Sequence, residues 1–154
     1  MSVNKNSLGF LLADVTRQMR RAFEKRLAGS FLTLAQARVL VYVSRQEGIR
    51  QIDLAELLDV QPITLTRLID QLVSGGVLER RPDPTDRRAY QLYLLPSAKA
   101  HLESIEEVTR SIREEALDGL TERQVSDLLT MLQKMHDKLS VPSFSDKPLP
   151  KTLA

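Results

Sequence analysis

The fold of this 154-residue chain is decided by the stretch IDLAELLDVQPITLTRLIDQLVS at residues 52–74. Its apolar residues recur at steps of three and four on both sides of Asp59-Val60, which predicts a short helix, a tight turn and a longer helix over residues 61–74. Pro62 is tolerated in the first turn of the longer helix, and Gly75-Gly76 ends it. Two helices joined in this way form a helix-turn-helix, whose second helix enters the major groove of DNA.

The longer helix carries a polar face beside its apolar one. The polar face presents hydroxyl, amide and guanidinium groups, which read base edges and hold phosphates, and an exposed isoleucine there can touch a thymine methyl group. The candidate DNA-contacting residues on this helix are Gln61, Ile63, Thr64, Thr66, Arg67 and Gln71. An ordinary amphipathic helix of a helical bundle shows the same pattern, so the helix pair alone leaves both interpretations open.

The period of the apolar residues changes after this helix. Residues 77–81 and 89–94 read as two short strands, and the turn-rich sequence RRPDPTDRR at residues 80–88 joins them as a hairpin with an extended loop. A charged turn is most often simply solvated. Directly after a helix-turn-helix, however, a hairpin is a wing, and an arginine at its tip can reach the negative minor groove. The wing therefore favours DNA binding over the helical-bundle interpretation.

Helices with wide apolar stripes are predicted on both sides of this unit. One runs from Leu8 to Gly29, and two more follow Pro96 and the capping-box sequence Thr121-Glu122-Arg123-Gln124. The central unit is too small to cover these stripes, so we expect a second copy of the chain to bury them. The stripe residues expected at this dimer interface are Leu8, Leu11, Leu12, Val15, Leu128, Leu132 and Met135.

Two further helices are expected inside the central unit. The capping-box sequence Thr33-Leu34-Ala35-Gln36 opens a helix that ends near Gly48. A short helix over Ile49–Leu58 is expected to face the core through Ile52, Ala55, Leu57 and Leu58. The expected fold is mainly α, a winged helix-turn-helix with a two-stranded wing. One domain spans 1–140, with a DNA-binding lobe at 33–95, dimerisation helices at 5–29 and 96–140, and a tail at 141–154.

Composition excludes several classes of function. The chain has no cysteine, which removes disulfides, thiolate nucleophiles and thiol redox switches. No phosphate-binding loop, metalloprotease or serine-hydrolase motif is present, so neither an enzymatic activity nor a cofactor is expected. His101 and His136 fall on different predicted helices, so no metal site is expected. No apolar run reaches the roughly 18 residues of a membrane span, and no secretory signal opens the chain, which predicts a cytoplasmic protein without a membrane partner.

The sequence resembles the MarR family, nearest its SlyA-like branch. The resemblance is carried by LAELL at residues 54–58, TLTRLIDQL at 64–72, GVLER at 76–80 and the wing signature DPTDRR at 83–88, and it extends from Leu8 to Leu139. It implies a homodimer joined through its N- and C-terminal helices, with two winged lobes that bind double-stranded DNA at a palindrome. It also implies a cleft between the dimerisation helices and each lobe, where phenolic or other aromatic anions bind as small-molecule effectors.

The resemblance also implies roles for individual residues. Arg88 would enter the minor groove and Asp86 would hold it in place, while Arg87 would point toward phosphate or toward Asp70. In the implied cleft, one of Arg17, Arg20 and Arg21 could hold the carboxylate of an effector. Solvation of these arginines, or pairing with the acidic residues of 101–115, is the simpler interpretation.

One departure from the family pattern follows the wing. Leu95-Pro96-Ser97-Ala98 stands where the family usually has a threonine cap, and Pro96 at the first helical position would provide a different start. Two alternatives to a ligand-controlled regulator also stay open. A winged helix that binds protein commonly lacks basic residues such as Arg67 and Arg88, and an architectural DNA binder would show little sequence preference.

Overall fold

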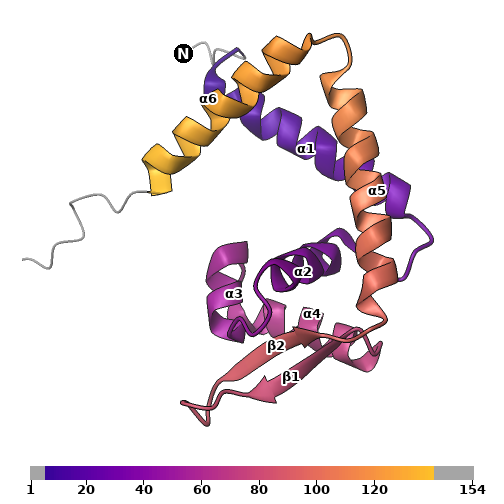
Figure 1. The fold of residues 1–154 in the computed structure, drawn as a ribbon, viewed down its shortest axis with the longest axis vertical. Coiled ribbons are helices and arrows are strands. Elements are labelled where there is room, and N and C mark those ends of the chain that lie inside the picture. The colour runs from indigo at the N-terminus through magenta and orange to yellow at the C-terminus, as the bar shows by residue number, and fades with distance from the viewer. Residues whose placement is uncertain (1–5, 141–154) are drawn as a thin grey trace, which may run out of the picture. The chain divides into compact units, whose positions relative to one another are not determined.

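The structure, a computed structural model, describes residues 6–140, so the expected tail at 141–154 lies outside the described residues. The elements follow the order α1 (Leu8–Leu27), α2 (Leu34–Arg45), α3 (Gln51–Leu58), α4 (Pro62–Ser74), β1 (Leu78–Pro82), β2 (Tyr90–Leu94), α5 (Ala98–Leu117) and α6 (Glu122–Ser140) (Figure 1). This order confirms the predicted fold class, which is mainly α with a two-stranded antiparallel wing.

Helix starts and the central turn follow local signals in the sequence. The capping box of α2 is formed, because the Gln36 backbone N–H donates to Thr33 Oγ1 at 3.2 Å and the Thr33 N–H donates to Gln36 Oε1 at 2.8 Å. α4 begins with Pro62, one residue after the predicted start, and Gln61 is its N-cap residue. Between α3 and α4, Asp59 adopts the left-handed conformation with φ of 52°, which Asp and Asn tolerate better than most residues.

Two compact units are distinguished, one up to Arg113 and one from Glu114 onward, with the boundary inside α5. The core of the first unit is aliphatic. Its largest fully buried side chains are Leu40, Leu54, Leu65, Ile69, Leu72, Leu78 and Leu92. In the second unit, α6 begins with a capping box formed by Thr121 and Gln124, and no residue of α6 is buried.

The predicted inner face of the short helix is partly wrong. Leu54, Ala55 and Leu58 are buried on α3, whereas Ile52 and Leu57 are 60% and 53% exposed. An eight-residue helix buries one face, and Ile52 and Leu57 lie roughly 100° around the axis from the centre of that face, given about 100° per residue. The assignment by apolar character alone therefore placed two solvent-facing residues in the core.

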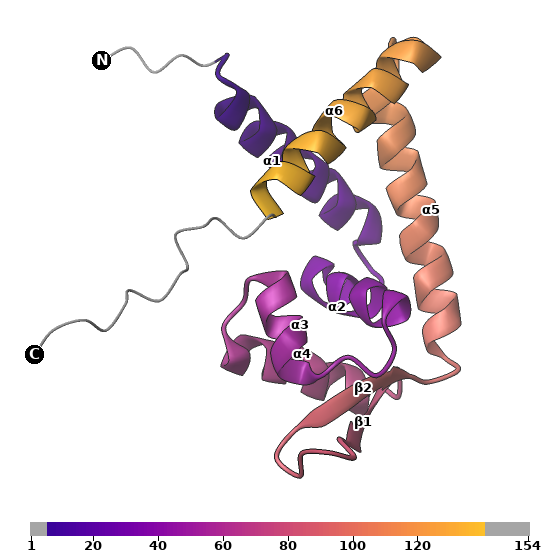
Figure 2. The same cartoon turned by 60° about the vertical axis from the view of Figure 1, so that its left-hand side comes forward.

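The hairpin has a third segment along one edge. β1 and β2 pair antiparallel, with Leu78 opposite Leu94 and Arg80 opposite Leu92. On the other side of β2, the Gly48 N–H donates to the Leu92 carbonyl at 2.8 Å and the Leu92 N–H donates to the Ile49 carbonyl at 3.0 Å. Figures 1 and 2 both show the hairpin tip projecting beyond the helices of the lobe. The root of the wing is therefore held on both sides while its tip projects.

The start of α5 differs from the prediction. The helix begins at Ala98, two residues after Pro96. A tight turn precedes it, because the Ala98 N–H donates to the Leu95 carbonyl at 2.9 Å. Ser97 Oγ donates to the Gly76 carbonyl at 2.6 Å, which ties this turn to the end of α4. The helix therefore survives without the usual threonine cap, but Pro96 is not its first residue.

Candidate nucleic-acid interface

The outward face of α4 is free for a partner. Leu65, Ile69 and Leu72 bury the opposite face completely. Gln61, Ile63, Thr64 and Arg67 are exposed, and their side chains make no hydrogen bond or ion pair with any residue from 6 to 140. No side chain caps the first turn of α4, so its N–H groups can also meet a phosphate. Of the six candidate residues on α4 and at its N-cap, four therefore have side chains that are free to contact DNA.

The two remaining candidates on α4 already have partners. Thr66 Oγ1 donates to the Pro62 carbonyl at 2.9 Å and accepts from Gln51 Nε2 at 3.0 Å. Gln71 Oε1 accepts from Nε2 of the buried Gln36 at 2.9 Å. The Thr66 hydroxyl is thus engaged within the lobe, whereas Gln71 is exposed and keeps its amide donors.

A chain of polar contacts fixes the root of the wing to α4. Arg80 Nη2 donates to Asp70 Oδ1 at 2.6 Å, and Arg80 Nε donates to Gln51 Oε1 at 3.1 Å. The expectation that Arg87 could pair with Asp70 is wrong, because Arg80 lies at the root of the hairpin beside α4 and takes that carboxylate. Through Gln51, the same chain reaches Thr66. Strand β1, α3 and α4 therefore share one hydrogen-bond network.

Asp83 organises the loop of the wing. It is only 5% exposed, and its Oδ1 accepts from Thr85 Oγ1 at 2.7 Å, from the Thr85 N–H at 2.8 Å and from the Asp86 N–H at 3.1 Å. The Thr85 hydroxyl and backbone N–H hold the pKa of Asp83 well below its ordinary value near 3.8, although burial acts in the opposite direction. The Asp83 carboxylate is therefore ionised and held by hydrogen bonds within the loop.

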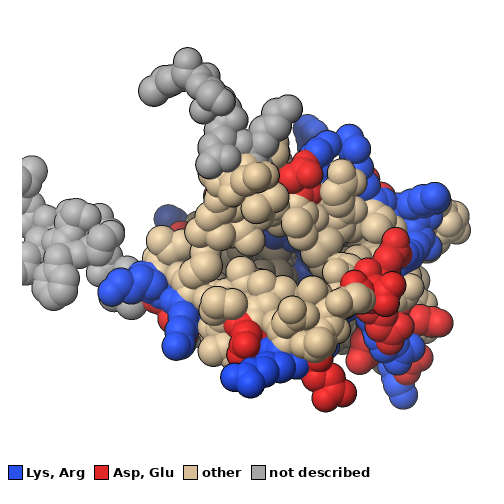
Figure 3. All heavy atoms as spheres, turned by 90° about the horizontal axis from the view of Figure 1, so that it is seen from above, with Lys and Arg blue, Asp and Glu red and all other residues tan. Residues whose placement is uncertain are grey.

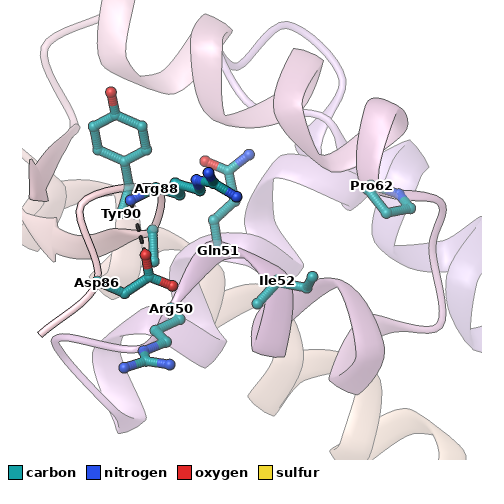
Figure 4. A pocket seen from close by; sticks show the side chains of 8 residues that line it. Arg50, Gln51, Ile52, Pro62, Asp86, Arg88 and Tyr90 are labelled. Atoms are coloured by element: carbon teal, nitrogen blue, oxygen red, sulfur yellow. Dashed lines mark hydrogen bonds between the residues drawn. The ribbon is translucent and has the colours of Figure 1, made fainter. Parts of the chain in front are cut away.

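The tip of the wing exposes Arg87 and Arg88. Asp86 Oδ1 accepts from the backbone N–H of Arg88 at 2.9 Å. The resemblance implied that Asp86 holds the Arg88 side chain, whereas in the structure it constrains the Arg88 backbone. The Arg88 side chain lines a cavity of about 370 Å³ together with Arg50, Gln51, Ile52 and Pro62. Figure 4 shows Arg88 extending toward Gln51 across this cavity. Arg81 differs from both, because it stacks 3.9 Å from the Tyr93 ring centre and pairs with Glu79.

The three arginines of α1 that were expected to bind an effector are exposed, and they have different surroundings. Arg17 pairs with Asp14, and Arg20 lines a cavity of about 170 Å³ with Met19, Phe23, Leu34, Thr109 and Ile112. A larger cavity of about 560 Å³ lies between α2 and α5, and sequence reasoning named none of its lining residues as effector contacts. Its lining combines cationic and apolar groups, notably Arg45, Arg110, Arg113, Val41, Leu102 and Ile105. Glu106 also lines it, so the charges around this space are mainly positive.

Apolar side chains are exposed on the terminal helices. On α1, Leu8, Leu11, Leu12 and Val15 are all exposed. On α6, Leu128, Leu132 and Met135 are half-buried, and Leu129, Met131 and Leu139 are exposed. Figure 3 marks charged side chains in blue and red and all other residues in tan, and uncharged residues are exposed on the face that it shows. Within residues 6–140, no helix is long and apolar enough to cross a membrane, and no group of three or more acidic or histidine side chains forms a metal site.

The helix pair α3–α4, followed by a hairpin with exposed arginines, defines a winged helix-turn-helix protein. The sequence model of the MarR family matches residues 32–90. The multiple antibiotic resistance protein MarR of Escherichia coli is 30% identical over 129 residues, which cover 83% of this chain and 90% of that protein. The chain belongs to the MarR family, whose members are transcriptional regulators and not enzymes.

Solved structures agree with this assignment. A mutant MarR of Escherichia coli complexed with operator DNA has 30% sequence identity and a TM-score of 0.74, covering 87% of this chain and 99% of that one. BpsR of Bordetella bronchiseptica, whose DNA binding is regulated by 6-hydroxynicotinic acid, has 24% identity and a TM-score of 0.75, covering 89% of this chain and 98% of that one. At this lower identity, the similarity to BpsR shows the fold alone.

Proposed function

We propose that the chain is a sequence-specific DNA-binding regulator that acts as a homodimer on a palindromic operator in the cytoplasm. The observation that carries this proposal is the free polar face of α4 beside the exposed arginines of the wing. Arg67 and Thr64 lie on this face without partners among residues 6–140. The α4 face would read the major groove, and Arg87 and Arg88 would meet phosphate and the flanking minor groove. The structure of the Escherichia coli relative in complex with operator DNA supports DNA as the partner.

The proposed dimer would use the terminal helices. Residues 33–95 would form the DNA-binding lobe, and residues 5–29 and 96–140 would form the dimerisation helices. In its wing sequence, the chain would be nearest the SlyA-like branch of the family. A twofold dimer presents two recognition helices, so its operator is an inverted repeat with half-sites about one helical turn, roughly 34–36 Å, apart. The exposed apolar residues of α1 and α6 support such an interface, because isolated surface stripes of this size are costly in water.

The oligomeric state tests this part directly. Light scattering of the purified protein at micromolar concentration should give twice the chain mass of 17.4 kDa. Leu11→Glu should shift the equilibrium toward the monomer, because a buried unpaired carboxylate is strongly disfavoured. Leu57→Glu, a matched change on the exposed surface of α3, should leave the mass unchanged. A wild-type protein that scatters as a monomer would contradict the proposed dimer.

We also propose that an aromatic anion modulates DNA binding. The cavity between α2 and α5 joins apolar walls to Arg45, Arg110 and Arg113, a combination that suits a ring bearing a carboxylate. Arg20 lines the smaller neighbouring cavity, and Thr109 belongs to both linings. The regulation of BpsR by 6-hydroxynicotinic acid is compatible with this ligand class. Such a ligand changes DNA affinity only if it binds one conformation of the protein better than another.

Calorimetric titration with 6-hydroxynicotinic acid and with 4-hydroxybenzoate would test the effector site. Arg110→Met should weaken binding of either probe about tenfold or more, which corresponds to the loss of one charge-assisted contact of roughly 1.4 kcal/mol. Lys99→Met removes a charge from the same helix outside this cavity and should bind the probes normally. Equal binding by Arg110→Met and the wild type would place the effector elsewhere.

The operator itself can be found by selection. Genomic fragments from the host that bind the immobilised protein should share an inverted repeat, and Arg67→Ala should enrich none of them. Recovery of fragments without a common motif would favour an architectural DNA binder. Failure to recover any fragment above background would favour a protein-interaction module.

A further inference from the structure

The loop that carries the wing arginines has little backbone support. Between β1 and β2, the Asp83 N–H donates to the Ala89 carbonyl at 3.0 Å and the Ala89 N–H donates to the Asp86 carbonyl at 3.1 Å. None of residues 83–89 lies in a strand or helix. A loop with so few backbone hydrogen bonds needs side-chain contacts to hold one conformation.

Those contacts converge on Asp83, and one of them comes from the helix-turn-helix. Asp83 Oδ2 accepts from Arg50 Nε at 2.8 Å and from Gln91 Nε2 at 3.3 Å, while Oδ1 takes three donors from the loop itself. Arg50 Nη2 also donates to Thr85 Oγ1 at 3.1 Å. Arg50, Asp83 and Thr85, here called the wing latch, therefore form a closed triangle of hydrogen bonds.

Arg50 is itself held in place at its backbone. It is the N-cap residue of α3, and its backbone forms an isolated bridge with Gln91 of β2. Both anchors lie within the lobe, so the guanidinium reaches Asp83 from a fixed base. The wing latch thus connects the projecting loop directly to the first residue of the helix-turn-helix.

We propose that Arg50 and Asp83 are positioning residues for DNA binding, which hold the wing loop so that Arg88 meets the minor groove. This inference rests on the proposed function. Asp83 is buried beneath the loop and acts through the residues that it hydrogen-bonds, whereas Arg88 makes the contact. The residues of the wing latch do not read the DNA sequence themselves. They affect DNA affinity through the position in which they hold Arg88.

Charge and position make opposite predictions for Asp83. Asp83→Ala removes a negative charge near DNA and frees the positive Arg50, so electrostatics alone predicts tighter binding. A loop that loses its anchor must be ordered again on binding, which predicts weaker binding. The sign of the change therefore separates the two accounts.

The test measures affinity by fluorescence anisotropy on a duplex carrying the selected inverted repeat with AT-rich flanks. Asp83→Ala should bind roughly tenfold more weakly than the wild type, the scale of one lost specific contact. In an Arg88→Ala background, the same change should cost less than about twofold, because the contact that the latch serves is already absent. Glu56→Ala, an exposed acid on α3 whose side chain makes no hydrogen bond or ion pair within residues 6–140, is the matched charge control and should bind as tightly as the wild type or more tightly.

A second variant covers the case in which Asp83→Ala fails to fold. Arg50→Met should weaken binding in the same direction, and Arg50→Lys should recover part of the loss by keeping the charge without the planar fork. Amide hydrogen exchange at Thr85 and Asp86 should accelerate in Arg50→Met without DNA present. Tighter binding by Asp83→Ala, an equal loss in the Arg88→Ala background, or unchanged amide exchange would overturn the latch. If the wild type itself binds no DNA, the proposed function fails, and the exchange measurement still decides whether the latch orders the loop.

Discussion

Gly75, which follows the recognition helix, leaves no room for a side chain. A Cβ built on Gly75 would lie 2.5 Å from Cζ and 2.9 Å from Cε1 of Phe31, and 3.3 Å from the Gln71 carbonyl oxygen. Phe31 belongs to the loop before α2, and its ring centre lies 5.9 Å from that of His101 on α5. Gly75→Ala must therefore displace the Phe31 ring from its place between α4 and α5.

The size of the effect follows from how much of Phe31 is covered. The ring is 55% exposed, so its packing protects roughly 100 Å² of the 150–250 Å² that an aromatic side chain can bury. At about 25 cal/mol per Å², full displacement costs at most about 2.5 kcal/mol. Alanine offsets about 0.4–1 kcal/mol of this by restricting the unfolded chain, since Gly75 has an ordinary helical conformation. We expect a net loss of about 1–2 kcal/mol.

Urea denaturation at one fixed protein concentration would measure this loss, because the stability of a dimer depends on concentration. Gly9→Ala is the matched control, since a Cβ built on Gly9 meets no described atom within 4 Å apart from its chain neighbours and its own helix backbone, and it should be neutral or slightly stabilising. In a Phe31→Ala background, Gly75→Ala should also become neutral or stabilising. A Gly75→Ala protein as stable as the wild type, or an equal loss with and without Phe31, would refute the reasoning.

Three further predictions concern the interface. Arg67→Ala should weaken operator binding by roughly 1–3 kcal/mol with an unchanged melting temperature, since its side chain has no partner among residues 6–140; normal binding in a titration would move the recognition face elsewhere. Arg88→Lys should lose more affinity than Arg87→Lys, and most on operators with AT-rich flanks, because a phosphate accepts a point charge while the minor groove favours the guanidinium. Equal losses for the two variants on AT-rich and GC-rich flanks would contradict these separate roles of Arg87 and Arg88. The pKa of Asp83 is lowered in the folded protein, so its ionised form contributes stability that is complete above the ordinary value near 3.8 and is lost as pH falls below it. The difference in urea midpoint between wild type and Asp83→Asn should therefore stay constant from neutral pH to about pH 5 and shrink in stronger acid. A difference that stays constant throughout would oppose this role.

The order of the elements and the outward face of α4 could be predicted because their signals are local. Periodicity assigns Leu65 and Ile69 to one side of α4 and Arg67 to another, and Pro62 marks its start. On α3 the same reasoning failed for Leu57, because a helix of eight residues offers several apolar faces and packing selects one. Burial there depends on which neighbours the helix meets.

The partners within the interface depend on contacts between distant residues. Asp70 pairs with Arg80 and not with Arg87 because the hairpin places Arg80 beside α4, and the sequence does not indicate which arm of the hairpin faces the helix. Asp83 before Pro84 and Thr85 is a local signal for a side-chain turn, and the turn is present. The contact of Asp83 with Arg50 spans 33 residues and carries no local signal.

The central claim is that a dimer reads a specific inverted repeat through α4 and the wing. It is tested most directly by one titration, in which the wild-type protein binds the selected operator and a duplex of the same length with both half-sites scrambled, at physiological salt. The account predicts saturation at two chains per operator and binding that is about 1,000-fold or more weaker on the scrambled duplex. Equal affinity for the two duplexes, or saturation at one chain per operator, would contradict it.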